Sequence, residues 1–344
     1  MKAKEKVLVT GGAGFIGSHL ANELVRRGYR VTVLDDLSGG FAGNVEQKAR
    51  LIQGSVTDEN LIKVIFSREG FDYVFHLAAY AAEGLSHFIK KFNYENNLIG
   101  SINLINASIN HEVKCFVFAS SIAVYGKNQL PMTEEMVPVP EDPYGIAKLS
   151  VERELQVSHE MFGLDYVIFR PHNVYGEQQN IGDRYRNVVG IFMNQIMRGE
   201  TMTIFGDGEQ TRAFTYVRDV VPVMADAPFN PLARNQIFNI GAETPYTVNE
   251  LAKHVATAMG VSPIVKYLEA RNELKHAFSS HKRVEDVFGY KPKFSLQAGL
   301  ANMANWARQV GSRESRFFGE IEIAKNMPAS WQQSLSRPRA KVGT

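Results

Sequence analysis

The sequence predicts an α/β protein with a doubly wound parallel sheet and a smaller C-terminal lobe. Strand and helix patterns alternate through the first half of the chain, which is typical of a parallel sheet covered by helices on both faces. The strands are continuous apolar runs, as expected for strands buried on both sides. We expect strands at 6–10, 30–35, 50–53, 72–77, 114–119 and 166–170, and helices near 15–28, 58–68, 95–111 and 143–162.

The second half of the chain is less regular, because Gly, Pro, Asn and Asp separate its shorter segments. The segment 236–240 has the pattern of a strand that returns to the sheet, and helices are expected near 187–198, 247–259 and 296–310. We therefore divide the chain into a sheet domain over 1–170, joined by later strands, a smaller lobe over 171–311 and a polar tail over 312–344. Phe317, Phe318 and Trp331 are aromatic exceptions in the tail, which suggest that it docks on another surface.

Composition narrows the protein class. The chain has 344 residues and a formal net charge of +2, so no nucleic-acid partner is indicated. The single cysteine, Cys115, lies in an apolar strand and cannot form an internal disulfide, which fits a reducing compartment. No apolar run is long enough for a membrane span, and the first four residues leave no room for a signal peptide. We expect a cytoplasmic protein with no membrane partner.

A glycine-rich turn joins the first strand to the first helix. Gly11 permits a tight turn, Gly14 allows the backbone to approach a pyrophosphate, and Gly17 lets the helix pack closely on the strand. The free N–H groups at the helix start, at Phe15 and Ile16, can bind phosphate oxygens. Such a turn alone can also be an ordinary strand–helix connection.

The end of the second strand supplies the further evidence for a dinucleotide site. Asp35 stands at the distance from the glycines expected of a carboxylate that binds a ribose. Asp36 follows it, and no arginine stands beside it to pair with a 2′-phosphate, so NAD is favoured over NADP. The alternative is that Asp35 is a solvated turn residue.

Tyr144 and Lys148 are four residues apart on a predicted helix and therefore share one face. An ammonium group close to a phenol stabilises the phenolate, so we expect a lowered pKa that makes Tyr144 a proton acceptor. Viewed alone, the pair could equally be a surface pair on an exposed helix.

Ser120 and Ser121 follow the strand 114–119, at the sheet edge where open α/β sheets bind ligands. A hydroxyl at this edge could bind a substrate oxygen and pass a proton to Tyr144. We assign this role to Ser121, with Ser120 as the fallback. The alternative is that both hydroxyls only satisfy backbone groups.

Together these residues resemble the extended short-chain dehydrogenase/reductase superfamily, specifically its NAD-dependent nucleotide-sugar epimerases and dehydratases. The resemblance covers roughly residues 5–310 and implies a Rossmann sheet with a nucleotide-sugar-binding lobe. Its motifs are TGGxGFIG at 10–17, DxLSxG at 35–40, HLAA at 76–79, SSxxVYG at 120–126, PYGxxK at 143–148, RPxNVYG at 170–176, GDGxQTR at 206–212 and YVRDV at 216–220.

The resemblance implies a role for each matching residue. Ser121, Tyr144 and Lys148 would be catalytic. Asp58 and Val56 would meet the adenine of NAD. The expected cofactor-binding residues are Gly11, Gly14, Phe15, Ile16, Gly17, Asp35, Asp36, Ser38, Gly39, Val56, Asp58, Ala78, Ala79, Tyr80, Asn97, Tyr144 and Lys148. The expected substrate-binding residues are Ser121, Asn173, Arg212, Arg271, Glu273 and Ala277. His76 is expected to be structural, and no metal is expected.

One departure from the family pattern narrows the reaction. Dehydratases and decarboxylases of this group carry an acid just before VYG, whereas this chain has Ile122 and Ala123 in that loop. We therefore expect 4-epimerisation of a UDP-hexose or UDP-N-acetylhexosamine through a 4-keto intermediate. Glu83 is the nearby acid that keeps a dehydratase as the alternative. A net NAD-dependent oxidoreductase and a silent NAD-binding protein are further alternatives.

The resemblance also implies a pocket gate and an assembly. Ala277 is expected beside the sugar 2-substituent, where a small residue admits an N-acetyl group, although a one-residue slip would make Phe278 the gate. Members of the family commonly dimerise through the helices that correspond here to 95–111 and 143–162, so we expect a homodimer.

Overall fold

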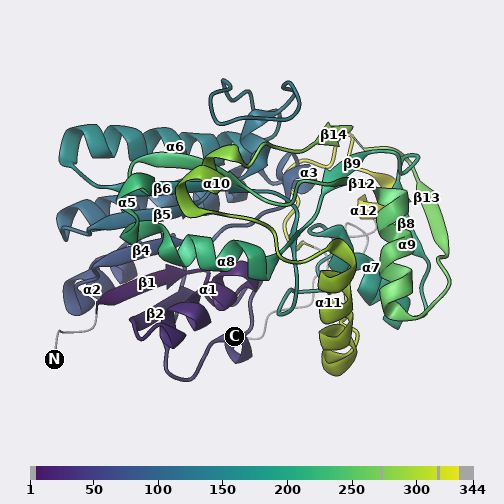
Figure 1. The fold of residues 1–344 in the computed structure, drawn as a ribbon, viewed down its shortest axis with the longest axis horizontal. Coiled ribbons are helices and arrows are strands. Elements are labelled where there is room, and N and C mark those ends of the chain that lie inside the picture. Colours follow the sequence, from purple (N-terminus) through teal and green to yellow (C-terminus); the bar gives the residue numbers. More distant parts are fainter. Residues whose placement is uncertain (1–4, 272–273, 316–317, 333–344) are drawn as a thin grey trace.

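The computed structural model describes residues 5–271, 274–315 and 318–332. Within these residues, seven strands form one parallel sheet in the order β11-β6-β5-β4-β1-β2-β3 (Figure 1). The strands are β1 (Lys6–Thr10), β2 (Arg30–Asp35), β3 (Arg50–Gln53), β4 (Tyr73–His76), β5 (Cys115–Ala119), β6 (Tyr166–Pro171) and β11 (Gln236–Ile240). The predicted α/β fold with a parallel sheet is confirmed.

Helices cover both faces of this sheet, and the alternation of side chains along each strand separates two hydrophobic cores. On β1, Val7 and Val9 face one core, whereas Leu8 faces the other. The first core includes residues of α1 (Phe15–Arg26) and α8 (Val217–Asp226), and the second includes residues of α2 (Glu59–Glu69), α5 (Gly100–Asn110) and α6 (Pro143–Phe162). The continuous apolar runs in the sequence reflect this burial on both faces.

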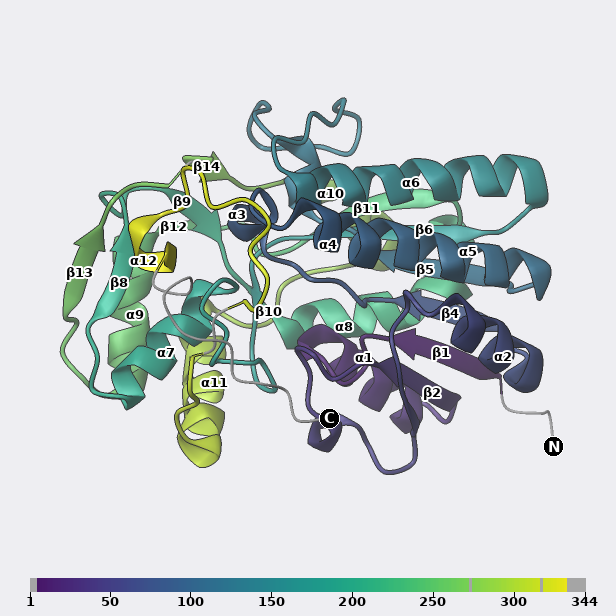
Figure 2. The same ribbon diagram turned by 180° about the vertical axis from the view of Figure 1, so that it is seen from behind.

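The second lobe lies beyond the carboxyl ends of the strands (Figure 2). Its helices are α7 (Val188–Met197), α9 (Val248–Met259) and α11 (Leu296–Val310). Three small sheets pair β7 (Val174–Tyr175) with β10 (Thr215–Tyr216), β8 (Met202–Phe205) with β13 (Val265–Leu268), and β9 (Thr211–Ala213) with both β12 (Pro245–Thr247) and β14 (His276–Ala277).

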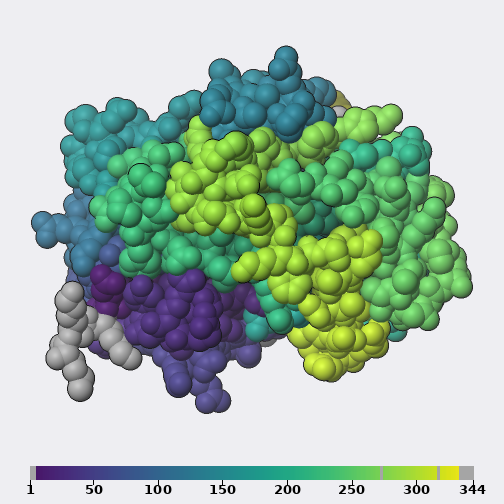
Figure 3. Space-filling model, in the orientation of Figure 1, coloured from purple at the N-terminus to yellow at the C-terminus, as the bar shows by residue number. Residues whose placement is uncertain are grey.

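The chain returns from the second lobe to the sheet. The predicted strand at 236–240 is confirmed as β11, which pairs with β6 in parallel. Helix α8 also packs on the sheet side, where Asp226 pairs with Arg27 after α1. On the face shown in Figure 3, the yellow-green segment containing α10 (Lys282–Phe288) and α11 runs across the junction of the two lobes.

The end of the described chain also returns to the molecule. Phe318 and Trp331 join a cluster with Ala82, Leu85 and Ile89, which belong to or flank α3 (Glu83–Ser86) and α4 (Lys90–Tyr94). The expectation that the tail docks is therefore confirmed for these two aromatic residues, the second of which lies in α12 (Ala329–Gln332). Phe317 lies outside the described residues.

Candidate active site

A cavity of about 1040 Å³ lies between the two lobes. It is lined by residues that lie one or two positions after four sheet strands: Gly11 after β1, Ala78 after β4, Ser121 after β5 and Asn173 after β6. Because parallel strands end at the same edge of the sheet, these residues are brought together from distant parts of the sequence.

The glycine turn leaves no room for side chains. Gly11 has a φ of +69°, and a Cβ there would lie 2.6 Å from the backbone nitrogen of Ala78. A Cβ on Gly17 would lie 2.1 Å from the carbonyl oxygen of Gly11. Helix α1 begins at Phe15 with no side-chain cap on its first N–H groups. The turn thus fits a pyrophosphate, which can approach the backbone and accept those N–H groups.

Asp35 is held at the end of β2 beside this turn. Its carboxylate accepts hydrogen bonds from the N–H of Ala13, at 2.9 Å, and of Leu37, at 2.8 Å. Burial raises the pKa of the carboxyl group, while these N–H groups favour its charged form. A fixed, mostly buried acceptor at this place fits the hydroxyls of a ribose.

Most of the expected cofactor-binding residues line the cavity. They are Gly11, Gly14, Phe15, Ile16, Gly17, Asp35, Asp36, Ser38, Gly39, Val56, Ala78, Ala79, Tyr80, Tyr144 and Lys148.

Two expected cofactor residues lie outside the lining. Asn97 is buried behind it, where its side chain accepts from the N–H of Tyr80 at 2.8 Å and donates to the carbonyl of Tyr80 at 3.1 Å. These two hydrogen bonds give Asn97 a role in fixing the loop at Tyr80. Asp58 instead caps helix α2 by accepting the N–H of Leu61 at 3.0 Å.

Ser121, Tyr144 and Lys148 meet in this cavity. Asp142 caps helix α6 by accepting the N–H of Gly145 at 2.8 Å, which sets the first turn that carries Tyr144. The Nζ atom of Lys148 donates to the carbonyl of Ala119 at 2.7 Å and lies 5.8 Å from the Tyr144 ring centroid. The predicted shared face of the Tyr144 and Lys148 pair thus points inward, and both side chains are buried.

The expected lowering of the Tyr144 pKa is not what the structure gives. Burial raises the pKa of the phenol, and the negative charge of Glu83 raises it further, whereas a hydrogen bond with Ser121 lowers it. Burial also lowers the pKa of Lys148 to about 7, against the opposing effect of Glu152. The helical spacing brings the two side chains together as expected, but desolvation disfavours the charged form of both groups.

Ser120 is engaged in a buried network. Its hydroxyl donates to Glu152, whose carboxylate also binds Arg170 through two hydrogen bonds. The Arg170 guanidinium lies 4.7 Å from the centroid of the Tyr125 ring. Because the Ser120 hydroxyl is bound to Glu152, Ser121 is the serine that forms a hydrogen bond with the Tyr144 side chain. His76 is likewise structural, since its ring contacts the hydroxyls of Thr10 and Ser101.

The expected substrate side lies across the cavity, in the second lobe. Asn173, Arg212, Arg271 and Ala277 line it. Arg212 donates to the carbonyls of Thr211, Leu274 and Lys275, at 2.8, 2.6 and 3.1 Å. Glu273 lies outside the described residues.

The expected gate residue is placed by strand β14. Ala277 pairs in register with Arg212 of β9 and lines the cavity, where it is 5% exposed. Phe278, the alternative gate, is not among the lining residues. The register of β14 therefore favours Ala277 over the slipped count.

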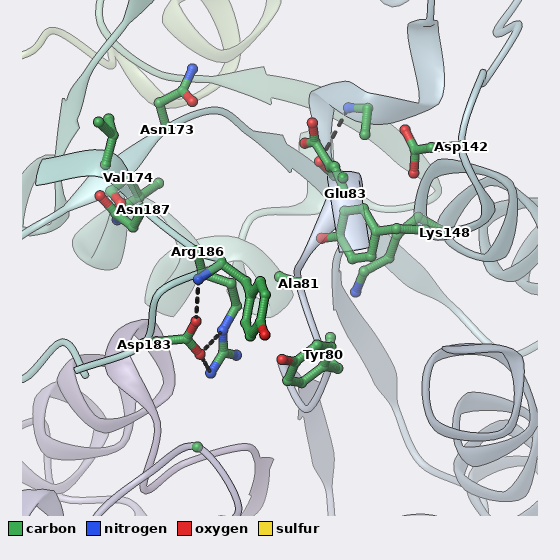
Figure 4. Close-up of a pocket in the computed structure, with 18 of the residues that line it drawn as sticks. Tyr80, Ala81, Glu83, Asp142, Lys148, Asn173, Val174, Asp183, Arg186 and Asn187 are labelled. Carbon is green, nitrogen blue, oxygen red and sulfur yellow. Dashed lines mark hydrogen bonds and ion pairs between the residues drawn. The ribbon is translucent and has the colours of Figure 1, made fainter. Parts of the chain in front are cut away.

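Sequence reasoning missed a charged pair on one side of the cavity. Arg186 binds Asp183 through Nε at 2.6 Å, and its guanidinium lies 4.8 Å from the Tyr80 ring centroid. Figure 4 shows this pair on one side of the cavity, with Glu83 and Lys148 on the other. The only signal was the polar segment DRYR at 183–186, which has three charged residues, and such a segment is more often a solvated loop.

No cluster of three or more His, Cys, Asp or Glu side chains among the described residues could hold a metal ion. No helix within the described ranges is long and apolar enough to span a membrane.

Comparisons with known proteins agree with this geometry. Residues 7–241 match the NAD-dependent epimerase/dehydratase family. The crystal structure of a UDP-glucose 4-epimerase with UDP-glucose from Thermotoga maritima is 38% identical, with a TM-score of 0.82 over 89% of this chain and 99% of that one. The structure of a UDP-N-acetylglucosamine 4-epimerase from Methanobrevibacter ruminantium, in complex with UDP-N-acetylmuramic acid, is 32% identical. The TM-score is 0.83, and the match covers 90% of this chain and 100% of that one. A UDP-N-acetyl-alpha-D-glucosaminuronate decarboxylase from Bacillus cytotoxicus is 30% identical over 89% of this chain and 99% of its own length.

Proposed function

The chain belongs to the NAD-dependent epimerase/dehydratase family, and we propose that it interconverts UDP-hexoses or UDP-N-acetylhexosamines at C4 with NAD as its cofactor. The observation that carries the proposal is the meeting of Ser121, Tyr144 and Lys148 in one cavity with the arginines of the second lobe. The loop after Ser121 presents Ile122 and Ala123 to this cavity, and neither can donate a proton to a leaving group.

The proposed cofactor site is the half of the cavity that β1, β2 and β4 build. The turn of Gly11, Gly14 and Gly17 would hold the pyrophosphate, with Phe15 and Ile16 supplying N–H groups. Asp35 would accept the ribose hydroxyls. We propose that the adenine contacts Val56 and Asp58, although Asp58 would have to reach it from the start of α2.

The proposed reaction uses NAD together with side chains that line the cavity. Tyr144 accepts the proton of the sugar 4-hydroxyl in its phenolate form, which burial and the charge of Glu83 disfavour and which a positive charge on Lys148 favours. Ser121 holds the hydroxyl oxygen by a hydrogen bond. NAD, when bound, supplies the acceptor for the C4 hydride and returns it without net oxidation. The resulting 4-keto sugar turns about its diphosphate, which Arg212 and Arg271 hold because a guanidinium binds phosphate oxygens in pairs. Tyr144 then returns the proton to O4.

A panel of UDP-, GDP-, CDP- and dTDP-sugars, with products identified by NMR, tests this proposal. We expect the C4 epimer of a UDP-sugar and no net NADH. A 4-keto-6-deoxy product would instead establish a dehydratase, which the position of Glu83 near Tyr144 makes the second candidate. A uronic acid formed with net NADH would establish an oxidoreductase.

The size of the residue at 277 is expected to select the sugar. Ala277→Tyr should lower kcat/KM for UDP-N-acetylhexosamines by about tenfold or more, because overfilling a formed pocket costs about 1–3 kcal/mol. The same variant should retain activity on UDP-hexoses, which lack the N-acetyl group. Steady-state kinetics on both sugars, with Phe278→Ala as the matched control, measure this. Equal losses on both sugars would place the gate elsewhere.

We also propose a homodimer, formed through α5 and α6. Ile146, Val157 and Met161 share one face of α6 and are 40%, 50% and 68% exposed, and apolar side chains gathered on one exposed face are typical of an interaction surface. Pairing of two such faces would remove them from water. Light scattering should give twice the chain mass at micromolar concentration, and Val157→Glu with Met161→Glu should give a monomer. A wild-type monomer would contradict the proposal.

We also propose a reducing, cytoplasmic location, because the single cysteine, Cys115, cannot form an internal disulfide.

A further inference from the structure

Residues 318–332, which we call the strap, form one wall of the cavity. The strap lies outside the resemblance described above, which ends near residue 310, and no role assigned so far includes it. Figure 2 shows its yellow trace running between the two lobes and ending in α12. The strap residues that line the cavity are Asn326, Met327, Pro328, Ala329, Ser330 and Trp331.

The strap is fixed to the sheet lobe by hydrogen bonds to backbone groups of that lobe. The Glu322 carboxylate accepts the N–H groups of Lys91 and Phe92 at the start of α4, at 2.7 and 2.8 Å. The carbonyl of Phe88 accepts the N–H groups of Glu322 and Ile323, at 2.9 and 3.1 Å. These bonds hold the strap in one register against α3 and α4, and its buried Met327 packs there.

Trp331 connects the strap to the second lobe. It is 3% exposed, and its ring lies 6.2 Å from that of Phe88 and 6.4 Å from that of Phe205. The Arg271 guanidinium lies 3.8 Å from the Phe205 ring centroid and 5.4 Å from that of Trp331. One side chain of the strap therefore contacts both lobes and the arginine proposed to hold the diphosphate.

We propose that the strap completes the nucleotide-sugar pocket and that Trp331 is a positioning residue for Arg271, an inference that rests on the proposed function. A guanidinium placed over aromatic faces is attracted to them and keeps its planar fork oriented. Less side-chain freedom is then lost when it binds phosphate oxygens, so affinity rises. The strap thereby sets affinity for the nucleotide diphosphate without touching the atoms that react.

Binding of UDP, which carries the diphosphate but no sugar, tests this inference by calorimetry on the NAD-loaded protein. Trp331→Leu keeps an apolar side chain but removes the aromatic face, and we expect its Kd for UDP to rise about tenfold. KM for the UDP-sugar should rise by a similar factor while kcat changes little. Trp331→Phe should restore most of the affinity. Trp331→Leu with the Kd of the wild-type protein would overturn the inference.

The second tryptophan offers a matched control, because the chain contains only two. Trp306 packs against the core from α11 and does not line the cavity. Trp306→Phe should bind UDP like the wild-type protein, and its remaining Trp331 fluorescence should change on UDP binding. Fluorescence of Trp331→Phe, which retains Trp306, should not change. A Trp331 signal that is insensitive to bound UDP would also overturn the inference.

These measurements separate the inference from the proposed function. A wild-type protein that binds UDP but epimerises no sugar would contradict the proposed function, and the UDP affinities would still test the strap. Normal epimerisation with unchanged UDP affinity in Trp331→Leu would contradict the strap alone.

Discussion

Tyr144→Phe is expected to lower kcat by about a hundred- to ten-thousand-fold, the usual contribution of a positioned acid or base. Only the phenol oxygen is removed, so the ring keeps its buried place on α6 and leaves no large cavity. NAD content and the thermal unfolding midpoint should therefore stay close to those of the wild-type protein. Turnover of the UDP-sugar, measured beside the NAD content of the purified protein, checks both parts.

Ser121→Ala and Ser120→Ala provide the matched comparison for this prediction. Ser121→Ala should slow the same step less severely, because Tyr144 remains to accept the proton. Ser120→Ala should act mainly on stability, since its hydroxyl is bound by Glu152. Near-normal turnover in Tyr144→Phe would show that Tyr144 is not the base.

The sheet could be predicted from the sequence because its signals are local. The strands β1 to β5 lie within the predicted segments, and β6 extends one residue beyond its predicted end. The glycine turn between β1 and α1 is specified by residues adjacent in the chain. Helix α8 was not predicted, because Pro222 lies inside it and proline normally indicates a helix boundary. Its packing against the sheet lobe offsets this local cost, which no local pattern reveals.

The sequence predicts the part of the candidate site that lies just after a sheet strand or at the start of the next long helix. Ser121 and Tyr144 flank neighbouring elements, β5 and α6, and they meet as expected. Trp331 reaches the same cavity from the far end of the chain, and Arg186 reaches it from a loop. Their contacts depend on how the lobes pack, so motif spacing could not place them. The direction of the Tyr144 pKa shift was missed for a related reason, because burial is a property of the packed structure.

Glu152→Gln is expected to lower the free energy of unfolding by about 3–5 kcal/mol. Glu152 and Arg170 are 1% and 2% exposed, and their carboxylate and guanidinium form two hydrogen bonds. Burial alone would lower the pKa of Arg170, but the carboxylate offsets this and raises it, so Arg170 stays charged. Removing the carboxylate charge leaves that guanidinium buried without its counter-charge, which is the costly state. Chemical denaturation monitored by circular dichroism measures the loss.

Two further variants separate this cause from a general packing defect. Glu152→Met combined with Arg170→Met removes both charges and should recover most of the lost stability, because two apolar side chains of similar length need no counter-charge. Glu59→Gln breaks a pair with Lys63 in which both side chains are more than 60% exposed, and it should cost less than about 1 kcal/mol. A Glu152→Gln loss no larger than that of Glu59→Gln would contradict the prediction.

Glu152→Gln should also lower the pKa of Lys148 further, since Glu152 is the group that raises it. The stability of this network and the protonation of the proposed catalytic lysine therefore depend on the same carboxylate.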